Sequence, residues 1–210
     1  MGFDLVGILY TLPGIIIGLT FHEFAHAQTA VWLGDDTPRL QGRTSLNPLA
    51  HLDIIGFIMI LIAHFGWAKP VQINPLNFEH RKRDDILVSL AGPVMNILLA
   101  CLFLILMKVT YYLTVNIILD VTTYNILITI FDYAAWINIV LCIFNLLPIP
   151  PLDGSHIIFG LAGQMYSNLY YQVARWSTFI FIALIIFNVF GTIIIPPVTL
   201  IYNALKGIIL

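Results

Sequence analysis

Three ionisable residues in an apolar stretch carry the clearest chemistry in the sequence. His22, Glu23 and His26 form an H-E-x-x-H pattern within G-L-T-F-H-E-F-A-H-A-Q-T-A, residues 18–30. On a helix, positions i and i+4 lie on one face, so the two imidazoles can bind one metal ion side by side. Glu23 directly follows the first histidine, where its carboxylate can reach a water molecule on that metal.

The apolar setting of this pattern strengthens the metal hypothesis. Two histidines on a soluble helix are usually surface residues, and H-E-x-x-H occurs by chance in many proteins. A charged group in the middle of a membrane, however, costs a few kcal/mol and usually has a role. We therefore expect a metal site rather than a structural polar cluster. Zinc is favoured, because imidazole and carboxylate ligands suit it.

The composition indicates an integral membrane protein. Hydrophobic residues make up 60% of the 210-residue chain and charged residues only 10%, whereas soluble domains have roughly a quarter charged residues. The net charge is -2 with no long basic or acidic run, so nucleic acid is not expected as a partner. The length fits a single domain over residues 1–210. Cys101 and Cys142 lie in apolar runs and are expected to be buried hydrophobes.

The hydropathy pattern predicts an all-α polytopic membrane protein with about four transmembrane helices. The predicted spans are residues 5–33, 86–107, 126–147 and 170–195. Residues 50–63 are too few to cross a bilayer, so a re-entrant or interfacial helix is expected there. Residues 198–210, after Pro196-Pro197, are expected to form a second short interfacial helix. The polar stretches 37–48 and 66–75 are rich in proline and glycine turns and predict a small membrane-associated β-hairpin or sheet.

The basic residues indicate how the chain is oriented in the membrane. With the four spans above, seven of the nine lysines and arginines fall on one side. Positive residues favour the cytoplasmic side. The pattern thus predicts a multi-pass protein of the cell membrane, with the end of the His22–His26 helix towards the cytoplasm. No internal repeat is evident, which weighs against the inverted-repeat transporters.

A catalytic zinc ion usually has three protein ligands and a water molecule, so a third ligand is required. The candidates are His51, Asp53, His64, Glu79, His80, Asp153 and His156. Asp153 is the best of them, because it follows a span that returns to the side where the first helix ends. Prolines 148, 150 and 151 preclude regular helix before it, and irregular backbone at membrane depth usually lines a cavity. The alternative is a turn aspartate before Gly154.

Three motifs in order resemble the site-2 protease family of intramembrane zinc metalloproteases. They are H-E-F-A-H in the first span, A-G-P-V-M-N opening the second, and N-L-L-P-I-P-P-L-D-G ending the third. With N-P-L-A-H-L-D they cover the chain from about residue 10 to residue 160. The chain resembles the compact prokaryotic members, since it has no insertion large enough for a PDZ or CBS domain.

The resemblance implies roles for individual residues. It implies one zinc ion bound by His22, His26 and Asp153, with Glu23 as general base and acid. It implies that Asn145 lies beside the site and helps to position the substrate or stabilise the oxyanion. Gly92, Pro93 and Asn96 match a packing motif near the site, and His51 is expected either near the ligands or in a structural role.

Two further expectations concern the substrate and the rival function. The expected substrates are transmembrane segments of other proteins, and residues 39–47 or 68–74 are expected to pair with the unwound substrate as a strand edge. The alternative is a membrane zinc or ion carrier that uses His22, His26 and Asp153 as its transport site. A catalytically inactive homologue is disfavoured by the intact motif residues.

Overall fold

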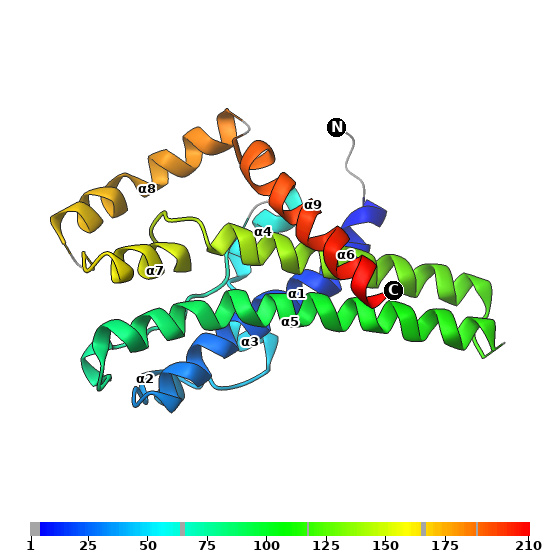
Figure 1. Cartoon of the computed structure of the whole chain (residues 1–210), viewed down its shortest axis with the longest axis horizontal. Coiled ribbons are helices and arrows are strands. Elements are labelled where there is room, and N and C mark those ends of the chain that lie inside the picture. The colour runs from blue at the N-terminus through cyan, green and yellow to red at the C-terminus, as the bar shows by residue number, and fades with distance from the viewer. Residues whose placement is uncertain (1–4, 64–65, 117, 165–166, 188) are drawn as a thin grey trace.

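The computed structural model describes residues 5–63, 66–116, 118–164, 167–187 and 189–210, and nearly all of its regular structure is helical (Figure 1). The helices are α1 (Leu5–Trp32), α2 (Thr37–Leu40), α3 (Pro48–His51), α4 (Ile54–Ala63), the 3-10 helix η1 (Pro75–Asn77), α5 (Arg81–Val115), α6 (Val121–Asn145), α7 (Asp153–Leu161), α8 (Asn168–Ile186) and α9 (Val189–Ile209). The predicted all-α architecture is confirmed.

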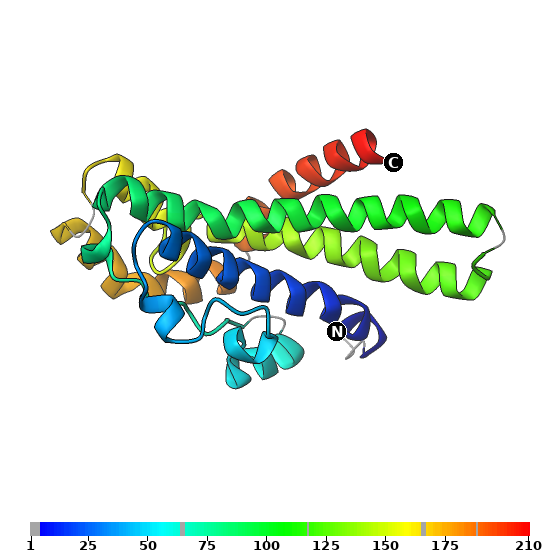
Figure 2. The ribbon, with the colours of Figure 1, turned by 90° about the horizontal axis from the view of Figure 1, so that it is seen from below.

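A pair of long helices, α5 and α6, forms the centre of the molecule. Figure 2 shows α1 on one side of this pair and α9 on the opposite side. The buried apolar core is shared by α5, α6 and α9. Its members are Leu99, Ala100, Phe103, Leu104, Met107, Ala134, Ala135, Ile139, Ile194, Val198 and Tyr202. Helices α7 and α8 lie together at the end of the bundle where α5 begins (Figure 1).

Small residues let α1 approach α6 closely. A Cβ atom on Gly14 would lie 2.6 Å from the Cα atom of Ala134. Ala134 itself is fully buried. In a membrane, where helices associate by close packing rather than by the hydrophobic effect, small residues at a crossing permit the contact. The crossing holds α6 against the helix that carries both histidines.

Four helices in the described residues are long and apolar enough to cross a membrane. They are α1, α5, α6 and residues 191–209 of α9. The predicted number of spans is therefore confirmed, but the predicted fourth span, residues 170–195, is wrong. The chain instead forms α8 up to Ile186 and a separate helix, α9, from Val189.

The fourth span was misplaced because Pro196 and Pro197 lie within α9 instead of ending a helix. Proline removes a helical hydrogen bond and normally favours a break. Here Ile194, Val198 and Tyr202, at helical spacing on either side of the prolines, are buried against α5 and α6. This packing stabilises the helix through the prolines, so residues 198–210 are not the separate interfacial helix that was predicted.

The predicted β-hairpin or sheet is also wrong. In the described part of the chain the recorded pairing of extended segments is one isolated antiparallel bridge between Leu52 and Ala68. Thr37–Leu40 forms a helical turn with Pro38 near its start. Residues 66–74, here called the strap, pair with the preceding segment around this bridge, where the Lys69 N–H donates to the His51 carbonyl at 2.8 Å. The rest of the strap is held mainly by side chains, as described below.

The crossing of α1 and α6 can be tested with Gly14→Val. Its side chain has to displace the backbone of Ala134, so we expect stability to fall by about 1–3 kcal/mol. The measurement is the thermal unfolding midpoint in detergent. Gly207→Val is the matched control, because a Cβ atom on Gly207 meets no atom within 4 Å. Equal midpoints for the two variants would contradict the described crossing.

Candidate metal centre

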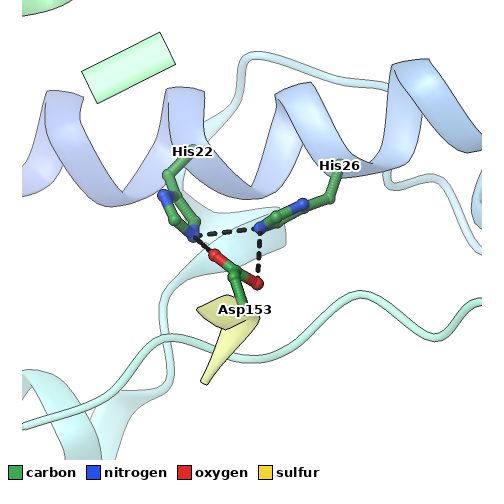
Figure 3. Close-up of side chains that lie close together, drawn as sticks. All are labelled: His22, His26 and Asp153. Carbon is green, nitrogen blue, oxygen red and sulfur yellow. Dashed lines mark hydrogen bonds and ion pairs between the residues drawn. The ribbon is translucent and has the colours of Figure 1, made fainter. Parts of the chain in front are cut away.

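His22, His26 and Asp153 converge at one point of the bundle (Figure 3). Both histidines come from α1, and Asp153 is the first residue of α7. The Nε2 atoms of the two histidines lie 3.0 Å apart. The Asp153 carboxylate oxygens lie 3.2 Å from Nε2 of His22 and 3.3 Å from Nε2 of His26. The aspartate favoured on sequence grounds is thus adjacent to both histidines.

The position of Asp153 depends on how α7 packs. Gly154 lies so close to the end of α6 that a Cβ atom there would be 2.1 Å from the carbonyl oxygen of Leu146. Further along α7, Nδ1 of His156 lies 3.2 Å from a carboxylate oxygen of Asp85 on α5. Helix α7 is therefore fixed at its start to α6 and in its middle to α5, with its first side chain directed at α1.

Hydrogen bonds at the Nδ1 atoms of His22 and His26 determine whether the facing Nε2 atoms carry a proton or a lone pair. Nδ1 of His26 lies 2.7 Å from the backbone carbonyl of Val88, which can only accept. Nδ1 of His22 lies 2.7 Å from the side-chain oxygen of Asn96. Each Nδ1 therefore carries a proton. In a neutral imidazole the other nitrogen, Nε2, then has a free lone pair.

This arrangement fits a bound cation. Two lone pairs facing each other at 3.0 Å repel, and a buried carboxylate beside them also needs a positive partner. Asp153 Oδ2 is buried and has no hydrogen bond in the described structure. Two imidazoles and a carboxylate form a common catalytic zinc ligand set. Zn–N bonds of about 2.0–2.1 Å in a tetrahedron bring two nitrogens to about 3.3 Å, close to the spacing seen here.

Gly92 on α5 provides the space for the two imidazoles. A Cβ atom there would lie 2.5 Å from both Cε1 of His22 and Nε2 of His26. Contacts this short essentially never occur at real Cβ atoms, so a side chain at this position would force the imidazole rings or the helices to shift. Two residues of the A-G-P-V-M-N motif therefore shape the site. Gly92 leaves room for the imidazoles because it has no side chain, and Asn96 provides a hydrogen-bond acceptor for His22.

Glu23 lies beneath the strap. Its carboxylate accepts a hydrogen bond of 3.0 Å from the backbone N–H of Val71. The strap is anchored nearby by Arg43, a buried residue whose guanidinium donates to the carbonyls of Ala50, Lys69 and Pro70. Beyond the single bridge to Leu52, a side chain of α1 and a buried arginine therefore hold the strap in place.

The far end of the strap is held by Asp35. Its carboxylate accepts from the backbone N–H of Asn74 at 2.7 Å and from the side chain of Asn77 at 2.7 Å. Burial alone would raise the pKa of Asp35, but hydrogen bonds from Thr37, Asn74 and Asn77 outweigh it and hold the pKa below its ordinary value. Asp35 is therefore ionised at neutral pH and keeps its acceptor role.

The other candidate ligands lie elsewhere. His51 is buried beside the strap, with Nε2 2.6 Å from the Ser45 carbonyl, and Asp53 caps α4 by accepting from Gly56. Glu79 and His80 have side chains that are 85% and 56% exposed. His156 pairs with Asp85, as described above. His64 lies outside the described residues.

The two asparagines that the sequence motifs singled out, Asn145 and Asn96, both have hydrogen-bond partners in the structure. Asn145 is half-buried, and its side-chain nitrogen donates to the Leu141 carbonyl one turn back on α6. Asn96 was assigned to packing on sequence grounds, yet it contacts His22. A buried amide in an apolar span is the signal that could have indicated this contact, because such a group needs a polar partner from another helix.

The space at Gly92 can be tested with Gly92→Ala. The added methyl group pushes the imidazoles apart, so we expect zinc affinity to fall roughly tenfold or more while the helices remain intact. Zinc affinity is measured by competition with a chelator, and helix content by circular dichroism. Gly160→Ala is the matched control, since its Cβ meets only the flexible end of Ile86. Unchanged zinc affinity in Gly92→Ala would refute this account of the site.

Comparisons with known proteins agree with this donor set. The family model described as "Peptidase family M50" matches residues 10–188. The chain is 38% identical over 177 residues to the Bacillus subtilis protein named "Putative zinc metalloprotease YwhC", which covers 84% of this chain and 80% of that protein. No solved structure matches the chain.

Two more distant relatives have names of the same form. The Mycobacterium tuberculosis protein Rip2 (strain H37Rv) is 30% identical over 149 residues, or 68% of this chain, and the chain spans about half of Rip2, 53%. The Methanocaldococcus jannaschii protein MJ0611 is 28% identical over 156 residues, or 74% of this chain and 72% of that protein. The family match over most of the chain, together with these relatives, assigns this multi-pass membrane protein to peptidase family M50, the zinc metalloproteases.

Proposed function

We propose that this metallopeptidase cleaves peptide bonds in or near transmembrane segments of other proteins. One zinc ion per chain is held by His22, His26 and Asp153. The observation that carries the proposal is the convergence of two imidazole lone pairs and a carboxylate within a bundle of membrane-length helices. A site built from α1, α5 and α7, beside helices long enough to cross a membrane, is suited to substrates that are already in the membrane.

Glu23 is the general base and acid of the proposed reaction. Zinc, when bound, lowers the pKa of a water molecule towards neutrality and polarises a carbonyl group. Glu23 takes a proton from the attacking water and later gives it to the nitrogen of the departing amine. The exposed part of the site is at Asp153, whose side chain is 18% exposed against 5% and 8% for the histidines.

Asn145 is proposed to stabilise the oxyanion or position the substrate. It is the last residue of α6, at the start of the connection that leads to Asp153. Its amide nitrogen has a backbone partner within its own helix, the Leu141 carbonyl. A second proton on the same nitrogen is available for a substrate oxygen.

The strap supplies the proposed edge for substrate pairing. Its residue Val71 already donates to Glu23, so the strap passes directly over the proposed base. No backbone partner is recorded for Gln72 and Ile73 within the described residues. An extended substrate segment can pair with these groups by main-chain hydrogen bonds. Residues 39–47 are the weaker of the two predicted edges, because Arg39 and Leu40 belong to α2.

The site is proposed to face the cytoplasm. Six of the nine basic residues lie between the end of α1 and the first turn of α5. They are Arg39 in α2, Arg43 after it, Lys69 in the strap, and Arg81, Lys82 and Arg83 at the start of α5. Lys108 and Lys206 belong to the opposite half, where Lys108 donates to the Ile209 carbonyl. The bias agrees with the positive-inside rule.

Glu23→Gln tests the role of the base. We expect cleavage of a co-expressed membrane substrate to fall by about 10²–10⁴-fold, because the amide cannot take the proton. Zinc content is expected to stay at the wild-type level. Cleavage products are measured by mass spectrometry and zinc by elemental analysis. Glu79→Gln is the matched control, since that side chain is 85% exposed.

The same variant separates the protease from a carrier. A carrier would show zinc flux into vesicles in the wild-type protein, and Glu23→Gln would lose zinc if Glu23 were a ligand. Full proteolysis by Glu23→Gln would overturn the proposed mechanism. The relatives named as metalloproteases do not favour the carrier.

Gln72→Pro tests the proposed pairing edge. Proline removes the backbone N–H while leaving the metal ligands untouched. We expect cleavage to fall roughly tenfold, the equivalent of about one hydrogen bond, with zinc content unchanged. Gln72→Ala is the matched control: it removes the side-chain contact with Gln41 but keeps the N–H. Equal cleavage by the two variants would show that the strap does not pair with substrate at this position.

A further inference from the structure

Two buried asparagine side chains, Asn138 on α6 and Asn96 on α5, form a hydrogen-bonded network that ends at His22. The side-chain nitrogen of Asn138 donates to the Ala134 carbonyl at 2.8 Å and to the Gly14 carbonyl at 3.4 Å. Its oxygen accepts from the side-chain nitrogen of Asn96 at 2.9 Å. The oxygen of Asn96 lies 2.7 Å from Nδ1 of His22. Both asparagines are fully buried.

The partners of Asn138 determine which way the amide groups of this network point. Backbone carbonyls can only accept, so Asn138 must turn its NH₂ group towards Ala134 and Gly14. Its oxygen then faces Asn96. In the reversed orientation, the oxygen of Asn138 would face two carbonyl oxygens, and lone pairs would repel at each contact. The environment of Asn138 therefore allows one orientation.

The orientation of Asn138 determines that of Asn96. The Asn96 NH₂ group faces the Asn138 oxygen at 2.9 Å and the Gly18 carbonyl at 3.2 Å. The Gly18 carbonyl is the weaker partner, because it is farther away and also accepts the bond of the α1 helix from residue 22. With its NH₂ group held on this side, Asn96 can present only its oxygen to His22.

We propose that Asn138 is a positioning residue for the metal centre: acting through Asn96, it fixes the proton of His22 on Nδ1 and so keeps Nε2 free as a ligand. The inference rests on the proposed metal site at His22. A neutral imidazole has one proton, so an acceptor at Nδ1 selects the tautomer whose lone pair is on Nε2. Asn138 itself contacts neither His22 nor Asp153 in the recorded interactions.

The close packing of α1 supports a defined position for Asn138. A Cβ atom on Gly18 would lie 2.9 Å from the Asn138 oxygen. The absence of a side chain at Gly18 thus provides the space that the Asn138 amide occupies. Buried amides that are fully paired hold a single geometry, whereas a partly paired network is costly in a low-dielectric interior.

The competing explanation is that Asn138 only joins α1, α5 and α6 as an interhelical hydrogen-bond partner. That role would affect stability without selecting a tautomer of His22. The two explanations are separated by Asn138→Leu and Asn138→Asp. A protonated aspartic acid keeps both the donor towards Ala134 and the acceptor towards Asn96, whereas leucine keeps neither. Asn125→Leu, at an exposed position of the same helix, is the matched control.

The experiment uses the full chain in detergent and has two measurements. The first is the ¹⁵N spectrum of histidine-labelled, metal-free protein, in which the His22 signals are assigned by their absence from His22→Gln. The second is zinc affinity by chelator competition. We expect Nδ1–H for His22 in the wild type, in Asn138→Asp and in Asn125→Leu. In Asn138→Leu we expect a mixture of tautomers and zinc affinity lowered roughly tenfold or more.

Three outcomes would overturn the proposal. They are wild-type tautomer and zinc affinity in Asn138→Leu, equal losses in Asn138→Leu and Asn138→Asp, and Nε2–H in the wild type. If Asn138→Leu does not fold, Asn138→Ser replaces it, because its short hydroxyl bonds back to the Ala134 carbonyl and does not reach Asn96. The tautomer is read without metal and without substrate, so failure of the proposed proteolysis remains distinguishable from failure of this inference.

Discussion

The structure depends on keeping two imidazole lone pairs and a carboxylate directed at one point among apolar helices. Without a cation these groups repel, so the surrounding helices must hold them in place. Helix α1 supplies both histidines, and α5 orients them through the Val88 carbonyl and Asn96. Asp153 follows α6 and begins α7. Helices α1 and α7 therefore contribute the candidate ligands, and α5 contributes the groups that orient the two histidines.

The same requirement explains why the groups that contact the two histidines are polar. A buried amide or imidazole cannot bond to lipid, so each needs a partner from a neighbouring helix. The partners here are the Val88 backbone carbonyl for His26 and the Asn96 side chain for His22. Glycines at positions 14, 18 and 92 complete the arrangement, because a methyl group at any of them would meet an atom within 3.0 Å.

The convergence of His22, His26 and Asp153 could be predicted from the sequence, because it follows from residue type and spacing. His22 and His26 are one helical turn apart, and the prolines before Asp153 mark irregular backbone. The strap could not be predicted in the same way. Its polar, turn-rich sequence suggested a hairpin or sheet, but apart from one bridge to Leu52 its partners are the side chains of Arg43, Glu23 and Asp35, which are distant in sequence. The fourth span failed for a related reason, since burial of Ile194 and Val198 outweighs the local preference of Pro196 to end a helix.

The way the strap is held bears on how a substrate would be bound. A strand that is paired on both edges has no backbone groups left for another strand. The strap is held mainly by side chains, and within the described residues the backbone groups of Gln72 and Ile73 have no backbone partner. Unpaired backbone is costly at membrane depth and is retained mainly where it lines a cavity or receives a partner. A transmembrane substrate that has unwound has the same unmet need. In the proposed function, pairing the two would satisfy both and would bring the scissile bond beside Glu23, which accepts from Val71 of the strap.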